Sequence, residues 1–189
     1  MAHAMVVSRA FYAEFDDVKG PCVLAEAPPG SLTEDAEGRR LWETFSDYVI
    51  TGNSALDGIV VQVRAGRDAV VCVPAVLRDD TKYARNALLF GLGVCVPGAC
   101  LPAVCGACTA SLKRLAATLR AMEAEAASAG DATAETTARR ARLASVLPPV
   151  LAALRDAAHA AARRPRSFWC AFSPGGAAER PVFFPRRAG

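Results

Sequence analysis

The sequence predicts an α+β domain in which most strands come before most helices. Strand-like stretches and one short helical pattern fill the first half of the 189 residues, and two long amphipathic helical patterns fill the second half. The expected order is two strands, a helix, three strands and two helices (ββαβββαα). Strands joined by short turns pair antiparallel, so we expect one antiparallel sheet with the helices packed around it.

The first unit is expected to be a β-hairpin followed by a short helix. Residues 5–15 and 22–27 are strand-like, and Lys-Gly-Pro at positions 19–21 marks the turn between them. From residue 37 to residue 50, apolar side chains recur at helical spacing, at Leu41, Phe45, Tyr48 and Val49. This pattern predicts an amphipathic helix with one face against the sheet.

Three further strands are expected before the long helices. Residues 56–63 alternate between apolar and polar side chains, and residues 69–76 form their partner strand across a turn at 64–68. Residues 87–94 are an apolar run that is typical of a buried strand. Together with the first hairpin, these stretches supply the strands of the predicted sheet.

The second half predicts two helices. Between residues 109 and 125, apolar side chains recur every three or four positions, at Leu112, Leu115, Leu119 and Met122. A second helix is expected from about residue 135, with a kink or a restart at Pro148 and Pro149. Residues 1–162 are therefore expected to form one domain. Residues 163–189 are expected to form a basic linker and a short hairpin, made by 167–172 and 181–185, that leads toward a further region.

Composition and charge exclude several classes of protein. Hydrophobic residues make up 52% of the chain, and the net charge of +3 is too small to indicate a nucleic-acid partner. Residues 86–112 carry no charge, but glycines and prolines interrupt them repeatedly, so we expect no transmembrane segment. The seven cysteines and the N-terminus without a signal-peptide pattern predict a cytoplasmic protein with reduced thiols.

The chain carries little of the machinery of an enzyme. Its two histidines, His3 and His159, sit where no Ser-His-Asp or Cys-His arrangement can be built. Gly91-Leu92-Gly93 lacks the third glycine and the downstream acid of a dinucleotide-binding loop. We therefore expect no self-contained catalysis and no bound cofactor.

Four cysteines lie close together in the sequence, at positions 95, 100, 105 and 108. Cys105 and Cys108 have the spacing of half a zinc knuckle, but Cys95 and Cys100 do not supply the second half. The favoured interpretation is a loop of small residues, 97–108, with reduced thiols and no metal. A zinc site is the alternative, and a redox role is a third.

The segment 82–90 combines charge with rigid neighbours. Arg85 lies between Tyr83 and Asn86, just before the predicted buried strand, and Lys82 precedes them. A planar, permanently charged guanidinium in this setting suits phosphate oxygens of a partner. The spacing alone favours a simpler alternative, an ion pair between Arg85 and Asp79 or Asp80 across the loop.

Several stretches between residues 11 and 154 occur in order and in register. They are Phe11-Tyr12-x-Glu14-Phe15 with Gly20-Pro21, Tyr48-Val49-Ile50-Thr51, Leu147-Pro148 and, most distinctively, Lys82-Tyr83-x-Arg85-Asn86-Ala87-Leu88-Leu89-Phe90. Together they resemble the nitrogen permease regulator 2-like family. The chain departs from the family pattern at Gly91, Val94 and Cys95. The resemblance implies that residues 1–162 form a longin-like domain, a five-stranded antiparallel sheet with packed helices.

The resemblance also implies a function. Members of this family are the GTPase-activating subunit of the GATOR complex, act on Rag GTPases, and restrain target-of-rapamycin signalling during amino-acid starvation. Arg85 occupies the position of the family's arginine finger, and Lys82, Tyr83 and Asn86 occupy the supporting loop. An arginine supplied in trans offsets negative charge on the transferring phosphoryl group. The resemblance therefore favours the catalytic interpretation of Arg85 over the ion pair with Asp79 or Asp80.

Partners and location follow from the same resemblance. The expected partners are a nitrogen permease regulator 3-like subunit, a DEP-domain-containing GATOR subunit and a Rag GTPase heterodimer. GTP and magnesium would belong to the GTPase, and the complex would be recruited from the cytoplasm to the lysosomal or vacuolar membrane surface. The alternative is a non-catalytic longin scaffold that heterodimerises with the 3-like partner.

Overall fold

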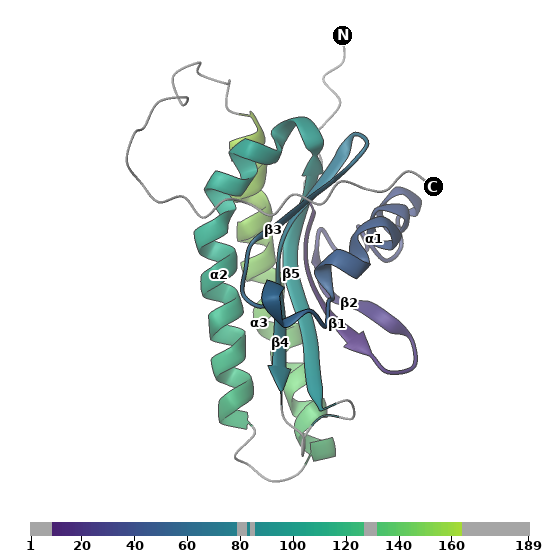
Figure 1. Cartoon of the computed structure of the whole chain (residues 1–189), viewed down its shortest axis with the longest axis vertical. Helices are drawn as coiled ribbons and strands as arrows, with labels where there is room; N and C mark the ends of the chain where they lie inside the picture. The colour runs from purple at the N-terminus through teal and green to yellow at the C-terminus, as the bar shows by residue number, and fades with distance from the viewer. Residues whose placement is uncertain (1–8, 79–82, 84–85, 127–131, 164–189) are drawn as a thin grey trace.

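A computed structural model describes residues 9–78, 83, 86–126 and 132–163 of the chain (Figure 1). Its elements are β1 (Arg9–Asp16), β2 (Gly20–Ala27), α1 (Ala36–Val49), a 3₁₀ turn η1 (Ser54–Leu56), β3 (Val61–Ala65), β4 (Asp68–Arg78), β5 (Ala87–Pro97), a second 3₁₀ turn η2 (Gly98–Cys100), α2 (Leu101–Ala126) and α3 (Ala132–Arg163). The order of strands and α-helices is the predicted ββαβββαα, and the α+β class is confirmed.

The five strands form one antiparallel sheet with helices on both faces. The strand order is β2-β1-β5-β4-β3, so β5 lies in the centre between β1 and β4. Helix α1 covers one face, and α2 and α3 lie side by side over the other (Figure 1). A longin-like arrangement of this kind has two apolar interfaces, one on each face of the sheet.

The two faces of β5 differ in character. Toward α2 and α3, β5 presents large buried side chains, including Phe90, Leu92 and Val94. Toward α1 it presents Gly91 and Gly93, and there the neighbouring groups come close. A Cβ atom on Gly91 would lie 2.6 Å from the carbonyl oxygen of Val49, at the end of α1. The absence of a side chain at position 91 therefore lets α1 pack directly onto the central strand.

Helix α2 begins earlier than the sequence analysis predicted. The stretch expected to be a loop, 97–108, contains η2 and the first two turns of α2, which starts at Leu101. Pro102 is the second residue of the helix, a position where its missing N–H costs nothing because that donor has no partner within the helix. Val104, Cys108 and Leu112 recur every four residues and are buried in the core beneath α2. Their burial outweighs the weak helix propensity of Gly106.

The predicted strand 56–63 is displaced toward the C-terminus. Leu56 belongs to η1, whose first turn is capped by the Asn53 side chain accepting from the amide of Ala55 at 3.0 Å. Gly58 follows with φ +71°, a left-handed conformation that breaks an extended strand. Strand β3 therefore starts only at Val61 and pairs with the first half of β4.

Helix α3 continues through its two prolines, so of the kink or restart expected at this point, the restart does not occur. Pro148 and Pro149 lie on the exposed side of the helix, whereas Leu147 and Leu151 are fully buried against the sheet. Packing of this apolar stripe offsets the backbone hydrogen bonds that the prolines remove. The predicted hairpin of 167–172 and 181–185 lies outside the described residues.

Replacing Gly91 by Ala is expected to destabilise the fold. The new methyl group would meet the Val49 carbonyl, which is backbone and cannot move aside. We expect a loss of about 1–3 kcal/mol in the free energy of unfolding, measured by urea denaturation. Gly106→Ala is the matched control because a Cβ atom added there, in α2, would have nothing within 4 Å. It should stabilise the helix by about 0.5–1 kcal/mol, and equal effects of the two variants would contradict the packing argument.

Candidate functional site

Two of the four residues predicted for the site are described. Tyr83 and Asn86 have defined positions, whereas Lys82 and Arg85 lie outside the described residues, as do Asp79 and Asp80. Both interpretations of Arg85, the exposed finger and the ion pair, therefore stay predictions. The structure describes the strands on both sides of this segment: β4 ends at Arg78, and β5 begins at Ala87.

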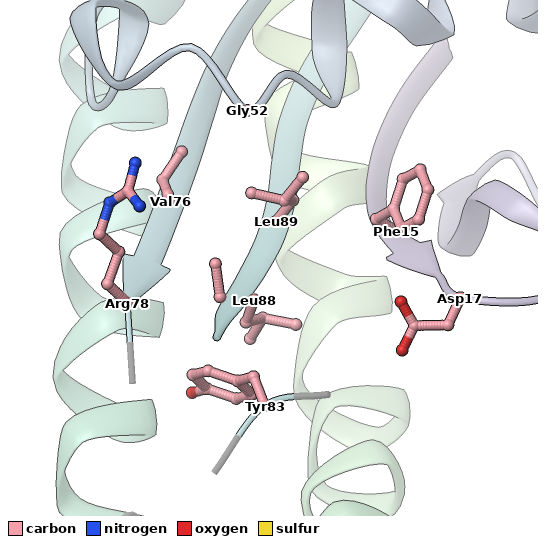
Figure 2. Close-up of a pocket in the computed structure, with 9 residues that line it drawn as sticks. Phe15, Asp17, Gly52, Val76, Arg78, Tyr83, Leu88 and Leu89 are labelled. Atoms are coloured by element: carbon pink, nitrogen blue, oxygen red, sulfur yellow. The ribbon is translucent and has the colours of Figure 1, made fainter. Parts of the chain in front are cut away.

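Three strand termini meet at this end of the sheet. Strand β1 ends at Asp16 and β4 ends at Arg78, while the antiparallel β5 between them begins at Ala87. Figure 2 shows the consequence: side chains of all three strands lie around one space, with Tyr83 below the strand ends. The segment that carries Arg85 in the sequence is thus attached to the sheet at this end.

A pocket of about 280 Å³ is formed here. Its apolar lining comes from Phe15, Val76, Leu88 and Leu89, and Tyr83 contributes its ring. Arg78 and Asp17 stand on opposite sides of the pocket (Figure 2). The hollow therefore has a mixed apolar and polar lining, with a basic and an acidic side chain at its margins.

Asn86, directly before β5, has an unusual backbone conformation. It is the one non-glycine residue with positive φ (+57°) among the described residues, and asparagine is among the side chains that tolerate this region best. Its backbone N–H donates to the carbonyl of Tyr83 at 2.8 Å. The residues on either side of positions 84 and 85 are therefore joined by a hydrogen bond.

Tyr83 is fixed at its ring as well as at its backbone. The ring is half-buried against the core between the sheet and α2, and its hydroxyl donates to a carboxylate oxygen of Glu123 at 3.2 Å. Glu123 lies in α2, 40 residues away in the sequence, and is only 6% exposed. Glu123 was not predicted as part of the site, because nothing in the local sequence distinguishes it from the solvated carboxylates of a helix.

The end of β4 is secured by a second polar contact that the sequence analysis did not identify. Beyond the last residue paired with β3, the Asp57 carboxylate accepts from the amide of Val76 at 2.8 Å. Next to it, the Gly58 amide donates to the Pro74 carbonyl at 2.9 Å. Asp57 also forms an ion pair with Arg120 of α2, whose pKa is lowered by burial. The loop thus takes the place of a strand along the edge of β4 and connects that edge to α2.

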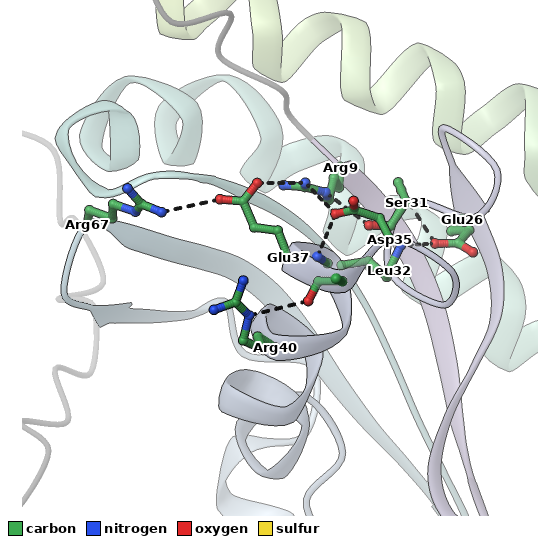
Figure 3. A network of polar contacts seen from close by, with 10 residues as sticks. Arg9, Glu26, Ser31, Leu32, Asp35, Glu37, Arg40 and Arg67 are labelled. Carbon is green, nitrogen blue, oxygen red and sulfur yellow. Dashed lines mark hydrogen bonds and ion pairs between the residues drawn. The ribbon is translucent and has the colours of Figure 1, made fainter.

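A separate polar network lies at the opposite end of the sheet (Figure 3). The Arg9 guanidinium contacts Asp35 at 3.4 Å and Glu37 at 3.6 Å, and its Nε donates to the carbonyl of Ser31 at 3.1 Å. Asp35 is also the N-cap of α1, accepting from the amide of Gly38 at 2.8 Å. These contacts hold the first turn of α1 against β1, far along the strands from the pocket.

The four clustered cysteines point into different surroundings. Cys95, in β5, is buried on the face of the sheet that α1 covers, and Cys108, in α2, is buried in the core on the other face. The Cys100 thiol lies 3.9 Å from the Ala162 carbonyl in α3, and the Cys105 thiol lies 3.5 Å from the Thr109 hydroxyl. In the part of the chain that the structure describes, no three Cys, His, Asp or Glu side chains come together as a metal centre requires.

Burial makes several of these thiols poor acids. It raises the pKa of Cys95 to about 12 and that of Cys108 to about 11. Burial also raises the pKa of Cys72, which packs beneath α1. Raised thiol pKa values are the opposite of what a metal ligand or a redox-active cysteine needs.

None of the helices within the described residues has the combined length and apolar character needed to cross a bilayer. The uncharged stretch at 86–112 is divided between the central strand β5, η2 and the start of α2. Its apolar residues pack in the two cores of the domain, one on each face of the sheet.

The fold and the site together define a longin-like domain with a pocket at the strand ends that precede and follow the Arg85 segment. Over 85 residues, the chain is 36% identical to the nitrogen permease regulator 2 homolog of Schizosaccharomyces pombe. The match covers 43% of this chain and 20% of the yeast protein, so the chain spans about a fifth of that relative. No protein-family model matches the chain.

Removing the Asp57 carboxylate is expected to loosen the end of β4. Asp57→Ala loses both the acceptor for Val76 and the partner of Arg120, so the free energy of unfolding should fall by about 1–3 kcal/mol in urea denaturation. Asp57→Asn keeps an acceptor oxygen and should lose less. Asp156→Ala removes an exposed ion pair with Arg155 and should change stability by less than about 0.5 kcal/mol. An Asp57→Ala variant as stable as Asp156→Ala would contradict this role.

Burial of the thiols predicts that the free energy of unfolding decreases at alkaline pH. An unfolded thiol ionises near pH 9, whereas Cys95 in the folded protein ionises near pH 12. The folded state therefore binds more protons than the unfolded state above pH 9, and its stability is lost as the pH rises from there. We expect each such thiol to contribute a slope approaching about 1.4 kcal/mol per pH unit above its unfolded pKa. Urea denaturation between pH 8 and 10.5 should show a smaller slope for Cys95→Ala, and an unchanged slope would contradict the assignment.

Proposed function

We propose that this chain is a nitrogen permease regulator 2-like subunit that activates Rag GTPases, and that Arg85 is the arginine finger it supplies in trans. The similarity to the yeast nitrogen permease regulator 2 homolog supports the family. The observation that carries the site is the anchoring of both residues that flank the Ala84–Arg85 pair. Tyr83 is held by Glu123, and Asn86 is held by the Tyr83 carbonyl.

The proposed reaction requires from this chain only one correctly placed guanidinium group. Phosphoryl transfer from GTP develops charge on oxygens near the β- and γ-phosphates, and a finger arginine stabilises that charge. The planar, permanently protonated guanidinium can contact two oxygens at once. GTP, magnesium and the attacking water belong to the GTPase, so this chain needs no cofactor of its own.

The pocket beside the segment supports docking of the GTPase at this end of the sheet. A finger arginine works only when its GTPase docks against the surface around it, and a hollow of about 280 Å³ with Arg78 and Asp17 at its margins lies there. In this proposal the longin-like domain assembles with a nitrogen permease regulator 3-like subunit and a DEP-domain-containing subunit. The complex acts on a Rag heterodimer at the lysosomal or vacuolar surface and restrains target-of-rapamycin signalling when amino acids are scarce.

Single-turnover GTP hydrolysis by a Rag heterodimer, with this chain and its 3-like partner present, tests the proposal. Arg85→Ala should lower the stimulated rate by on the order of 10³-fold or more without changing complex formation. Arg85→Lys keeps the charge but loses the forked donor geometry, so it should restore only part of the rate.

The matched control is Arg67→Ala. Arg67 lies in the turn before β4, at the end of the sheet away from the pocket, where it is 85% exposed and pairs with Glu37 at 3.5 Å. Its loss should leave the stimulated rate unchanged. Equal rates for Arg85→Ala and the unmodified chain would overturn the finger and favour the non-catalytic scaffold.

A further inference from the structure

We infer that the GTPase docks on the part of the sheet that continues past the end of α1, and that Arg78 there pairs with a carboxylate of the GTPase. We call this part the docking face; it consists of Phe15, Val76, Arg78 and Leu89. The inference rests on the proposed function and adds a residue for recognition to the one proposed for chemistry. Arg78 would bind the partner protein and would not touch the nucleotide.

Helix α1 is too short to cover its face of the sheet from end to end. Its 14 residues span about 21 Å, whereas the 11 residues of β4 and the 11 of β5 each span about 36 Å. The last residue of α1, Val49, lies over Gly91, whereas β5 begins at Ala87. On the opposite face, α2 and α3 have 26 and 32 residues and span about 39 Å and 48 Å. The α1 face of the strands therefore continues past its helix toward the pocket.

The docking face combines apolar side chains with one cation. Phe15 and Leu89 are half-buried and pack at the margin of the core beneath α1. Because side chains alternate along a strand, Arg78 lies on the same face of β4 as Val70 and Cys72 of that core. Phe15, Leu89 and Arg78 all line the pocket of about 280 Å³ (Figure 2). A partner that covered this face would meet apolar surface and a guanidinium together.

Arg78 differs from the arginines that hold the fold together. Arg9 and Arg67 pair with carboxylates at the far end of the sheet, and Arg120 pairs with Asp57. Arg78 is exposed, and its side chain makes no hydrogen bond or ion pair within the part of the chain that the structure describes. A forked guanidinium in this state is complementary to a carboxylate on another protein. This charge complementarity indicates an acidic side chain on the docked partner.

The position of the docking face indicates which partner it receives. Arg78 is the last residue of β4 and Ala87 is the first of β5, so the Arg85 segment leaves from and returns to this end of the sheet. A GTPase that uses Arg85 must approach the same end. The Arg9 network lies at the other end, away by the length of a strand of about 36 Å. The GTPase is therefore the partner that this face is placed to meet.

The test separates affinity from rate. Single-turnover hydrolysis by a Rag heterodimer is measured at rising concentrations of the complex of this chain with its 3-like partner. Arg78→Glu would set two carboxylates against each other, so the half-saturating concentration of the complex should rise by on the order of 10- to 100-fold. The saturated rate and the melting temperature should stay unchanged, because Arg78 is exposed and has no partner among the described side chains.

Arg39→Glu is the matched control. Arg39 lies near the start of α1, beside the Arg9 network, and its exposed side chain likewise forms no ion pair with any described residue. The same change of charge there should leave the half-saturating concentration unchanged. Raising the salt concentration from about 50 to about 300 mM should weaken binding of the unmodified chain more than binding of Arg78→Gln, because salt screens an exposed charge pair. Equal effects of Arg78→Glu and Arg39→Glu, or equal salt dependence of the two proteins, would overturn the inference.

The remaining outcomes distinguish docking from the proposed finger. Arg85→Ala should lower the saturated rate and leave the half-saturating concentration unchanged, the opposite of Arg78→Glu. If Arg78→Glu changes neither quantity while Arg85→Ala loses the rate, the docking face is overturned and the finger stands. If Arg78→Glu instead weakens assembly with the 3-like subunit, that subunit covers the face and the inference is overturned.

Direct binding of the GTPase to the complex tests Arg78 even if Arg85→Ala has no effect on the rate. Weaker binding by Arg78→Glu would then support the docking face while the finger is overturned, and unchanged binding would overturn both. A lower saturated rate of Arg78→Glu with unchanged binding would place Arg78 in the chemical step and overturn its role in docking.

Discussion

The close approach of α1 to β5 over Gly91 is the constraint on which the arrangement of the layers depends. The central strand lacks a side chain at this position, which leaves room for the Val49 carbonyl of α1, and it also lacks one at Gly93, where the Phe11 ring of the neighbouring strand β1 fills the space. The opposite face of the same strand carries Phe90, Leu92 and Val94, which fill the core shared with α2 and α3. One strand thus sets both interlayer spacings, because packed interiors have little room to adjust.

The position of β5 also determines what surrounds the candidate site. The strand begins at Ala87, directly after Asn86, while β4 ends at Arg78 with its edge held by Asp57. Both attachment points of the intervening segment are therefore fixed to the sheet. Contacts from Arg120 to Asp57 and from Glu123 to Tyr83 add α2 as a third support. Supports on rigid elements from several directions keep the described ends of this segment in one geometry.

Most of the fold could be predicted from the sequence because apolar periodicity records which faces are buried. The prediction was wrong at the start of α2. There Pro102, Cys105 and Gly106 are typical of a loop, and only the spacing of buried Val104 and Cys108 indicates a helix. The site was predicted only in part. Asp57 and Arg120 are 63 residues apart, and Tyr83 and Glu123 are 40 apart. No local pattern can pair such residues, since only the folded sheet brings them together.

The two ends of the sheet use charge in different ways. At the Arg9 end, one guanidinium contacts two carboxylates and the first turn of α1, an arrangement that satisfies charge within the domain. At the pocket end, Arg78 and Asp17 lie on opposite sides of a hollow of mixed lining, and the buried carboxylate of Glu123 accepts the Tyr83 hydroxyl. Buried ionisable groups stabilise a fold poorly compared with apolar residues of similar size, and their value lies in specifying one geometry. The domain accepts this cost at the end where its strands open onto a pocket, and there the buried Glu123 carboxylate holds the Tyr83 hydroxyl.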